Sequence, residues 1–314
     1  MSVIDKIKKR MLYSSIFGIF VIIALLIYAD VGKLTEAFIQ FKWTYIPVIV
    51  LLTLLNYIFR FYKWDYYLGK LDIDISKKDS FVVFFSGLVM SITPGKLGEV
   101  FKSYLLKQLD DIQISKSAPI IFAERLTDVM GLLILASVGI IVYDYSLNLL
   151  IAILTIFALI VLVIQSRILS MKIIDFCERL PLVSNYVHHL RLSYESAYTL
   201  LRHKPLLFTI AISIVSWFFE CIAMWYVLKG FGLGRPLLDA TFVFAFSSLA
   251  GAVSMLPGGL GIAEGSIVGL LHTLDVPNSI ATGTALIIRF GTLWFGVLSG
   301  IVVLSLNINK FQKD

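Results

Sequence analysis

The sequence predicts an all-α protein that crosses a membrane several times, and its composition, its apolar runs and an internal repeat all favour this fold class. Of the 314 residues, 58% are hydrophobic and 15% are charged, and the mean hydropathy is +0.88. Water-soluble domains average about 45–50% apolar and about 25% charged residues, so this chain has too few charges to cover a soluble surface. We therefore expect a single integral membrane domain over residues 1–314.

Six apolar stretches have the length of about 17–25 residues that a helix needs to cross a bilayer. They are 12–29, 44–60, 117–142, 147–165, 206–228 and 279–306. The first follows a basic N-terminal segment, which raises the alternative of a cleaved signal peptide. It is long for a signal peptide and no small-residue cleavage site follows it, so we expect an uncleaved anchor.

Two further apolar stretches are interrupted by proline and glycine. They run over 81–92 then 100–106, and over 237–256 then 262–274, with breaks at Thr93-Pro94-Gly95 and at Pro257-Gly258-Gly259-Leu260-Gly261. Each reads as two half-length helices, and non-helical backbone at membrane depth persists only where protein or a water-filled cavity satisfies it. We expect two broken hairpins, either re-entrant or fully crossing.

The positions of lysine and arginine predict the orientation. If the N-terminus is cytoplasmic and both hairpins return to the side they entered, the cytoplasmic stretches carry 21 of the 27 Lys and Arg residues and the outer loops carry four. Cytoplasmic loops of membrane proteins are enriched in these residues. We therefore expect a cell (inner or plasma) membrane protein with both termini in the cytoplasm. The net charge of +6 follows from these loops and does not indicate a nucleic-acid partner.

The two breaks are copies of one motif. Ser91-Ile92-Thr93-Pro94-Gly95-Lys96-Leu97-Gly98-Glu99 recurs 163 residues later (91 to 254) as Ser254-Met255-Leu256-Pro257-Gly258-Gly259-Leu260-Gly261, with Glu264 following. Similar offsets align the flanking spans. We predict an inverted-topology repeat with unit one at about 44–142, unit two at about 206–306 and a linking helix at 147–165. Inverted repeats with broken helices are typical of transporters, and the breaks indicate the binding site.

Eight charged residues lie in these apolar surroundings, namely Lys96, Glu99, Glu124, Arg125, Asp128, Glu220, Glu264 and Arg289. Each would cost about 2.5–3.5 kcal/mol if unpaired at the bilayer centre, so we expect pairing or a wet cavity. The spacing of Glu124, Arg125 and Asp128 places them on one helical face, where Arg125 pairs with its own helix's carboxylates. Since three cations face five carboxylates, we expect a protonated carboxylate or a cation supplied by the substrate.

The breaks also predict an anion site. A half-helix that starts after Gly95 or after Gly258-Gly259 directs free N–H groups and the positive end of its dipole at the break. Glycine lets a ligand approach the backbone closely, and such ends suit phosphate. The predicted binding residues are Lys96, Arg289, Gly95, Gly98, Gly258, Gly259 and Gly261. The alternative is that the glycines only allow tight packing and the ion pairs only hold helices together.

Several motifs follow one another along nearly the whole chain. They are Asn56-Tyr57-x-x-Arg60-x-x-Lys63-Trp64, the Thr93–Glu99 motif, Glu124-Arg125-x-x-Asp128, Trp217-x-x-Glu220, the Pro257–Glu264 motif and Arg289. In this order they resemble the family of the lysylphosphatidylglycerol synthase transmembrane (flippase-like) region. The family often has Arg where this chain has Lys96, which keeps the charge but loses a bidentate fork. We expect a stand-alone member without the aminoacyl-transferase domain, with Arg60 added to the charge network.

The resemblance implies the flipping of a phospholipid or a polyprenyl-phosphate-linked glycolipid between leaflets, its phosphate head bound near the midplane. It implies enzymes of envelope or glycan assembly as partners, and we expect no enzymatic activity, cofactor or metal. Two alternatives stay open. One is a membrane transferase acting on a lipid-phosphate-linked sugar, although the loops offer only Asp110-Asp111 and Asp72-x-Asp74 for a metal. The other is a carrier for a small soluble anion.

Residues 166–204 form a cytoplasmic segment with apolar stripes and basic faces, broken at Pro181. This pattern is typical of an amphipathic helix lying on anionic headgroups, and a plain connecting hairpin is the alternative. We interpret His188-His189 within it as a solvated pair.

Overall fold

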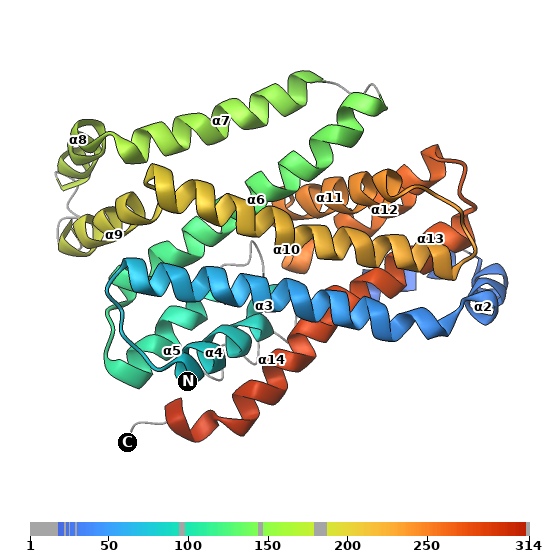
Figure 1. Cartoon of the computed structure of the whole chain (residues 1–314), viewed down its shortest axis with the longest axis horizontal. Coiled ribbons are helices and arrows are strands. Elements are labelled where there is room, and N and C mark those ends of the chain that lie inside the picture. The colour runs from blue at the N-terminus through green and yellow to red at the C-terminus, as the bar shows by residue number, and fades with distance from the viewer. Residues whose placement is uncertain are drawn as a thin grey trace.

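The computed structural model describes residues 18–21, 23–24, 26–28, 30–93, 98–143, 147–178 and 187–311, and within these ranges every regular element is a helix (Figure 1). The α-helices after Gly18–Tyr28 are α2 (Val31–Gln40), α3 (Ile46–Lys70), α4 (Lys77–Gly87), α5 (Phe101–Asp110), α6 (Ile114–Val142), α7 (Leu147–Gln165), α8 (Arg167–Glu178), α9 (Val187–Leu200), α10 (His203–Gly230), α11 (Leu237–Val253), α12 (Ile262–Thr273), α13 (Asn278–Arg289) and α14 (Phe295–Leu306). The short 3-10 or π segments are η1 (Trp43–Tyr45), η2 (Leu88–Ile92), η5 (Pro257–Gly259), η6 (Phe290–Trp294) and η7 (Ile308–Phe311).

The helices confirm the predicted polytopic all-α membrane fold. Four of them, counting continuous neighbours together, are long and apolar enough to cross a bilayer: Trp43–Lys70, Ile114–Val142, His203–Gly230 and Asn278–Leu306. Two bent pairs raise the number to six if each is one span. Gly18–Tyr28 turns by 95° into Val31–Gln40, and Ile151–Gln165 turns by 82° into Arg167–Phe176. Residues 12–17 of the first predicted span lie outside the described part of the chain.

Helix α3 extends well past the predicted end of its span at residue 60. The stretch that follows contains charged residues, but Lys63, Trp64 and Tyr67 are buried along one face of the helix. Burial of this face in the protein keeps the helix intact to Lys70, where hydropathy alone predicts a cytoplasmic loop. The charge of Lys63 is therefore inside the protein and does not contribute to a loop.

The expected outer loop over residues 29–43 contains helix α2. Asp30 has a φ of 63° and caps this helix, its Oδ1 accepting the Gly32 N–H at 3.1 Å. Leu34 and Ala37 are buried, and α2 contacts α13. Helix α2 has ten residues and one buried face, so it does not produce the long apolar stretch by which the sequence indicates a membrane span.

Helices α3 and α10 lie side by side and run in opposite directions (Figure 1). At one end the Lys42 N–H donates to the Gly230 carbonyl at 2.9 Å. At the other end the Tyr67 hydroxyl donates to Thr209 Oγ1 at 3.0 Å. The start of each helix therefore meets the end of the other, which is the pairing expected of two units related by inversion.

The remaining contacts between the two units are reciprocal. The first hairpin, through α4 and η2, packs on α14 of the second unit, and α11 of the second hairpin packs on α6 of the first unit. Two apolar clusters draw most of their residues from one unit each, around Trp64 and Leu106 in the first and around Met224 and Ile288 in the second. These contacts support the predicted repeat, whose limits stay a prediction.

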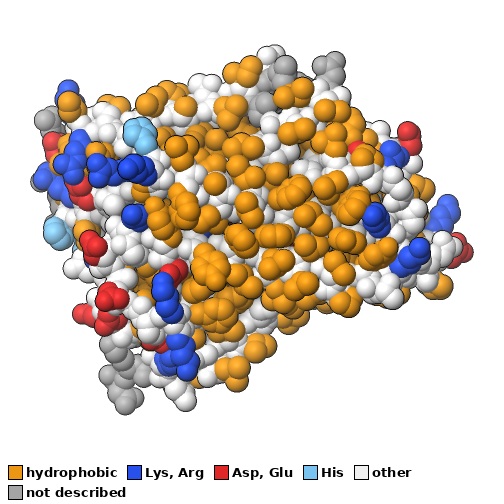
Figure 2. Space-filling view, viewed as in Figure 1, with side chains coloured by type: hydrophobic (Ala, Val, Ile, Leu, Met, Phe, Trp, Pro, Cys, Tyr) orange, Lys and Arg blue, Asp and Glu red, His pale blue; other side chains and the backbone are white. Residues whose placement is uncertain are grey.

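One face of the molecule carries a broad band of hydrophobic side chains between two charged ends (Figure 2). The cytoplasmic segment predicted at 166–204 lies at one of these ends as α8 and α9, while Pro181 lies outside the described residues (Figure 1). Helix α8 exposes Ile168, Ile173 and Phe176 beside basic residues, as an interfacial helix does. Helix α9 packs on α6, so part of the segment belongs to the folded body.

The close approach of α14 to the first hairpin yields a stability prediction. A Cβ on Gly300 would lie 2.6 Å from the Val89 nitrogen and 2.9 Å from the Phe85 carbonyl oxygen, so backbone has to move. We expect Gly300→Ala to cost about 1–3 kcal/mol, as overpacking does, and to lower the melting temperature in detergent. Gly269→Ala is the control, because no atom lies within 4 Å of its Cβ position. Equal melting of both variants would contradict the packing described.

Candidate functional site

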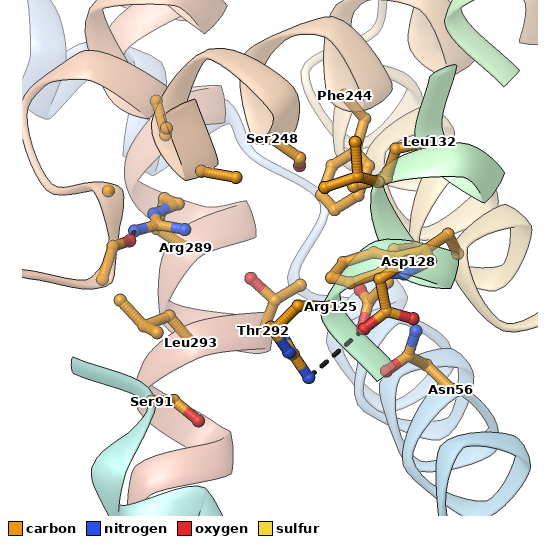
Figure 3. Close-up of a pocket in the computed structure, with 18 of the residues that line it drawn as sticks. Asn56, Ser91, Arg125, Asp128, Leu132, Phe244, Ser248, Arg289, Thr292 and Leu293 are labelled. Carbon is orange, nitrogen blue, oxygen red and sulfur yellow. Dashed lines mark hydrogen bonds and ion pairs between the residues drawn. The ribbon is translucent and has the colours of Figure 1, made fainter. Parts of the chain in front are cut away.

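Inside the protein η2, which precedes the first break, contacts η5 of the second break. Beside them lies a cavity of about 300 Å³ whose wall comes from both units (Figure 3). Ser91 belongs to the first hairpin, Gly258 and Gly259 belong to the second, and α3, α6, α10 and α11 supply most of the rest. The cavity therefore lies at the position that the duplicated motif indicates for a binding site.

Glycine conformations and one ion pair shape the second break. Gly258, Gly259 and Gly261 have φ angles of 59°, 68° and 85°, a region that glycine adopts most readily. Arg289 Nε donates to Glu264 Oε1 at 2.6 Å, and its Nη2 donates to the Gly258 carbonyl at 2.5 Å. Glu264 Oε2 accepts the Gly261 N–H at 2.6 Å. Arg289 thus connects α13 to both sides of the break while it lines the cavity.

The structure separates the seven predicted binding residues. Gly258, Gly259 and Arg289 line the cavity, whereas Gly98 and Gly261 are not part of its wall. The Gly98 N–H donates to Thr93 Oγ1 at 2.9 Å, and a Cβ there would lie 2.5 Å from that oxygen, so tight packing explains this glycine. The predictions for Gly95 and Lys96 fall outside the described residues.

A buried network of ion pairs joins the first hairpin to α3 and α6. Its six members are Lys63, Glu99, Lys102, Glu124, Arg125 and Asp128. Lys102 Nζ lies 2.5 Å from Glu124 and 3.8 Å from Glu99. Arg125 Nη2 lies 3.1 Å from Glu99 and 3.2 Å from Asp128, so it pairs both with its own helix, as predicted, and with the hairpin. Lys63 Nζ completes the chain at 2.5 Å from Asp128.

Two members of this network, Lys63 and Lys102, were not among the predicted site residues. Both are buried. Their spacing offered a signal, because Lys63 follows Arg60 by three residues and Lys102 follows Glu99 by three, which places each pair on one helical face. With them, and counting Arg60, Arg289, Glu220 and Glu264, five cations and five carboxylates of the described chain lie around the cavity, while the buried Asp239 pairs with Arg235. The expected shortage of cations is therefore not found.

Besides Arg289, two charged residues outside the network line the cavity. Glu220 Oε2 accepts a hydrogen bond from the Thr53 hydroxyl at 3.3 Å. The Arg60 guanidinium lies 5.6 Å from the centre of the Trp217 ring. Arg60 and Glu220 therefore extend the predicted charge network to α3 and α10.

The other candidate sites are simple surface features. His188 and His189 are exposed, and His189 Nδ1 lies 3.3 Å from Ser115 Oγ. The acidic pairs at 72/74 and 110/111 are exposed where helices end. Within the described ranges, no group of three or more His, Cys, Asp or Glu residues is arranged to hold a metal ion.

Comparison with known proteins identifies similar sequences. The family model described as "Lysylphosphatidylglycerol synthase TM region" matches residues 15–300. A UPF0104 membrane protein of Methanothermobacter thermautotrophicus is 24% identical, covering 92% of this chain and 91% of its own. A UPF0104 membrane protein of Methanocaldococcus jannaschii is 25% identical, covering 72% of this chain and 98% of its own.

Proposed function

Because the chain belongs to the family of the lysylphosphatidylglycerol synthase transmembrane region, we propose that it flips a lipid with a phosphate headgroup between the leaflets of the cell membrane. The substrate class is a phospholipid or a polyprenyl-phosphate-linked glycolipid. The protein acts as a transporter and not as an enzyme, it works beside enzymes of envelope or glycan assembly, and its termini face the cytoplasm.

The observation that carries this proposal is the charged cavity between the two breaks. Its volume of about 300 Å³ lies at the lower end of the range of about 300–1,000 Å³ for small-molecule sites, which suits a headgroup and excludes a whole lipid. Arg60, Arg125 and Arg289 all contribute to its wall. Three guanidinium groups around one hollow favour an anionic group, and their planar forks match phosphate oxygens.

The acyl chains need a route that keeps them in the bilayer. Near the end of α11 the side chain of Met255 is 65% exposed, and neighbouring Val253 is 74% exposed. Met255 lines the cavity and also faces outward. We infer that the tails leave past this apolar rim while the headgroup stays among the charges. This arrangement supports a lipid over a small soluble anion, which needs no apolar exit.

Reconstitution into vesicles tests the proposal. We expect wild-type protein to move a fluorescent phospholipid between leaflets, and we expect Arg289→Ala and Lys96→Ala to slow it by roughly ten- to a hundredfold, the value of one charge-assisted hydrogen bond. Lys107→Ala is the matched control, since Lys107 is an exposed lysine of the first hairpin. Unchanged flipping in both variants removes phosphate docking at these residues. A product formed from a lipid-phosphate-linked sugar would instead establish a transferase.

A further inference from the structure

Arg60 differs from every other buried cation in the described part of the chain. Its side chain lies within the protein at 6% exposure. Lys63, Lys102, Arg125 and Arg289 each have a carboxylate within 4 Å. No described carboxylate is within that distance of Arg60, and its Nε has no hydrogen-bond partner. Asp128 and Glu220 attract this guanidinium from beyond 4 Å, so no carboxylate occupies its donors, and the arrangement points to a partner that arrives from the cavity.

The surroundings of Arg60 leave its donors free for such a partner. The guanidinium lies near the face of Trp217, 5.6 Å from the ring centre, where a cation–π interaction holds it without using its N–H groups. Arg60 lines the cavity together with Asn56 and Tyr57 of the same helix. The other two arginines of the wall are already engaged, Arg125 by the carboxylate shown in Figure 3 and Arg289 by Glu264 and the Gly258 carbonyl.

We propose that Arg60 is the primary anchor of the cavity and binds the oxyanion of a phosphodiester headgroup. This inference rests on the proposed function and names the residue that carries it. Among the described cations in and beside the cavity, Arg60 is the one with no carboxylate within 4 Å, so an added negative charge is accepted there. A guanidinium offers two parallel donors to two phosphate oxygens, which a lysine cannot do.

Glu220 provides the decisive comparison. It lines the same cavity, and its described partner is the Thr53 hydroxyl. If Arg60 and Glu220 served only as a structural pair joined through water, neutralising either would damage the protein alike. If Arg60 binds an oxyanion, removing the carboxylate removes a repulsive neighbour, and the two changes then have opposite or unequal effects on binding.

Binding to the purified full-length protein in detergent tests this. The readout is tryptophan fluorescence and melting temperature with short-chain phosphatidylglycerol, with short-chain diacylglycerol as the neutral probe. We expect Arg60→Gln to weaken phosphatidylglycerol binding by roughly ten- to a hundredfold, as loss of a charge-assisted hydrogen bond does. We expect Arg60→Lys to have an affinity between those of wild type and Arg60→Gln, because lysine keeps the charge and loses the two parallel donors of the guanidinium. Glu220→Gln binds at least as tightly as wild type, and Lys107→Gln is unchanged.

Each contrary outcome has a distinct meaning. Wild-type binding in both Arg60 variants, or equal loss in Glu220→Gln, overturns the proposal. The same binding measurement with inorganic phosphate distinguishes a site for a free anion from a site for a lipid headgroup. Arg60-dependent binding of inorganic phosphate with no gain from the lipid keeps the oxyanion site and overturns lipid flipping. Arg60→Lys keeps the test valid if Arg60→Gln does not fold, since the lysine retains the buried charge.

A second observation concerns two contacts that occupy equivalent places in the two units. Asp79 and Asp239 are each the third residue of the first helix of a hairpin, α4 and α11. Lys310, beyond α14, donates to Asp79 at 2.6 Å, and Tyr143, beyond α6, donates to Asp239. The bond from Lys310 holds the pKa of the Asp79 carboxyl below its usual range. Each contact ties the hairpin of one unit to the last span of the other.

These ties lie at opposite ends of the molecule. Asp65 of α3 accepts from Ser80, next to Asp79, at the end where α3 finishes. Arg235 lies 3.7 Å from Asp239 and follows the end of α10. Since α3 and α10 are antiparallel, these are opposite ends. We infer that each tie holds the cavity closed toward its own end, so that release of one opens the cavity on that side.

Accessibility of a single cysteine in the cavity wall tests the ties. In a background of Cys177→Ser and Cys221→Ser, Ser248→Cys is labelled with an impermeant thiol reagent from each side of oriented vesicles. We expect Asp239→Asn to raise labelling roughly tenfold from the side where α11 begins. We expect Asp79→Asn to raise labelling from the opposite side, by less than about fivefold, because the ion pair of Asp79 is partly exposed. Asp275→Asn, an exposed acid, is the control. Unchanged or same-sided labelling in both variants overturns the inference, whatever the flipping assay shows.

Discussion

Replacement of Asp128 by alanine is expected to be among the most destabilising changes in this protein. Asp128 accepts hydrogen bonds from Lys63 at 2.5 Å and from Ser213 at 3.2 Å, and Arg125 lies 3.2 Å away. Without it, the ammonium of Lys63 stays wholly buried with only the hydroxyls of Ser213 and Thr127. Removing one partner of a buried ion pair costs about 3–5 kcal/mol, because the other charge is left uncompensated.

Melting in detergent, followed by circular dichroism, measures this effect. The matched control is Asp175→Ala, whose carboxylate pairs with Arg191 at 3.1 Å on the surface, where both side chains are about half exposed. Such a pair is worth about 0–1 kcal/mol, so we expect almost no change. The double variant Lys63→Met with Asp128→Leu should recover much of the loss, since it removes both charges together. Equal melting of the two aspartate variants would show that the interior around Lys63 is wet.

The comparison of Asp128 with Lys63 also shows what the sequence can predict. Glu124, Arg125 and Asp128 follow one another on one helix, so their shared face can be derived from helical spacing. Lys63 precedes Asp128 by more than sixty positions, and the contact depends on how α3 packs against α6. From the sequence alone, a charged residue near the end of an apolar stretch can equally well be a buried helix residue or a loop residue. Tertiary packing, which burial of Trp64 and Tyr67 reflects, decides between the two.

The broken hairpins were more predictable than the charges because backbone chemistry is local. Proline and glycine disfavour a continuous helix, and the duplicated motif placed the second break correctly, between α11 and α12. What each glycine does depends on its neighbours. Gly258 lines the cavity, whereas Gly98 packs against Thr93, although both belong to the duplicated motif. Helix α2 was missed for another reason, since a ten-residue helix with a narrow buried face produces no span-length apolar run.

The predicted anion site illustrates the same limit. Spacing alone places the N-terminus of α12 and Arg289 beside a break. The structure shows that Glu264 reaches both, through the Gly261 N–H and through Arg289 Nε. Glu264 is three residues into its helix, where a carboxylate commonly turns back to the free N–H groups. Among the described cations near the cavity, Arg60 is the one without a carboxylate within 4 Å, and only the packing of α3 against α10 reveals this.

Substitution of Gly259 by alanine is expected to have the second large effect, through backbone rather than charge. Gly259 has a φ of 68°, and a Cβ there would lie 2.9 Å from the Gly251 Cα and 3.1 Å from the Gly251 carbonyl oxygen. The left-handed conformation costs about 1–2 kcal/mol for a residue with a side chain. Overpacking against backbone adds about 1–3 kcal/mol, because neither α11 nor the break can yield by a rotamer change.

This variant also separates stability from function at the cavity. Both Gly251 and Gly259 line the wall, so a shift of the break away from α11 changes the shape of the cavity as well as the melting temperature. We expect Gly259→Ala to melt well below wild type and to bind short-chain phosphatidylglycerol more weakly. Gly265→Ala is the control, since no atom lies within 4 Å of its Cβ position and alanine favours a helix interior by about 1 kcal/mol. If Gly259→Ala melts like Gly265→Ala, the break does not pack against α11 as described, and the cavity between the two units has a different wall.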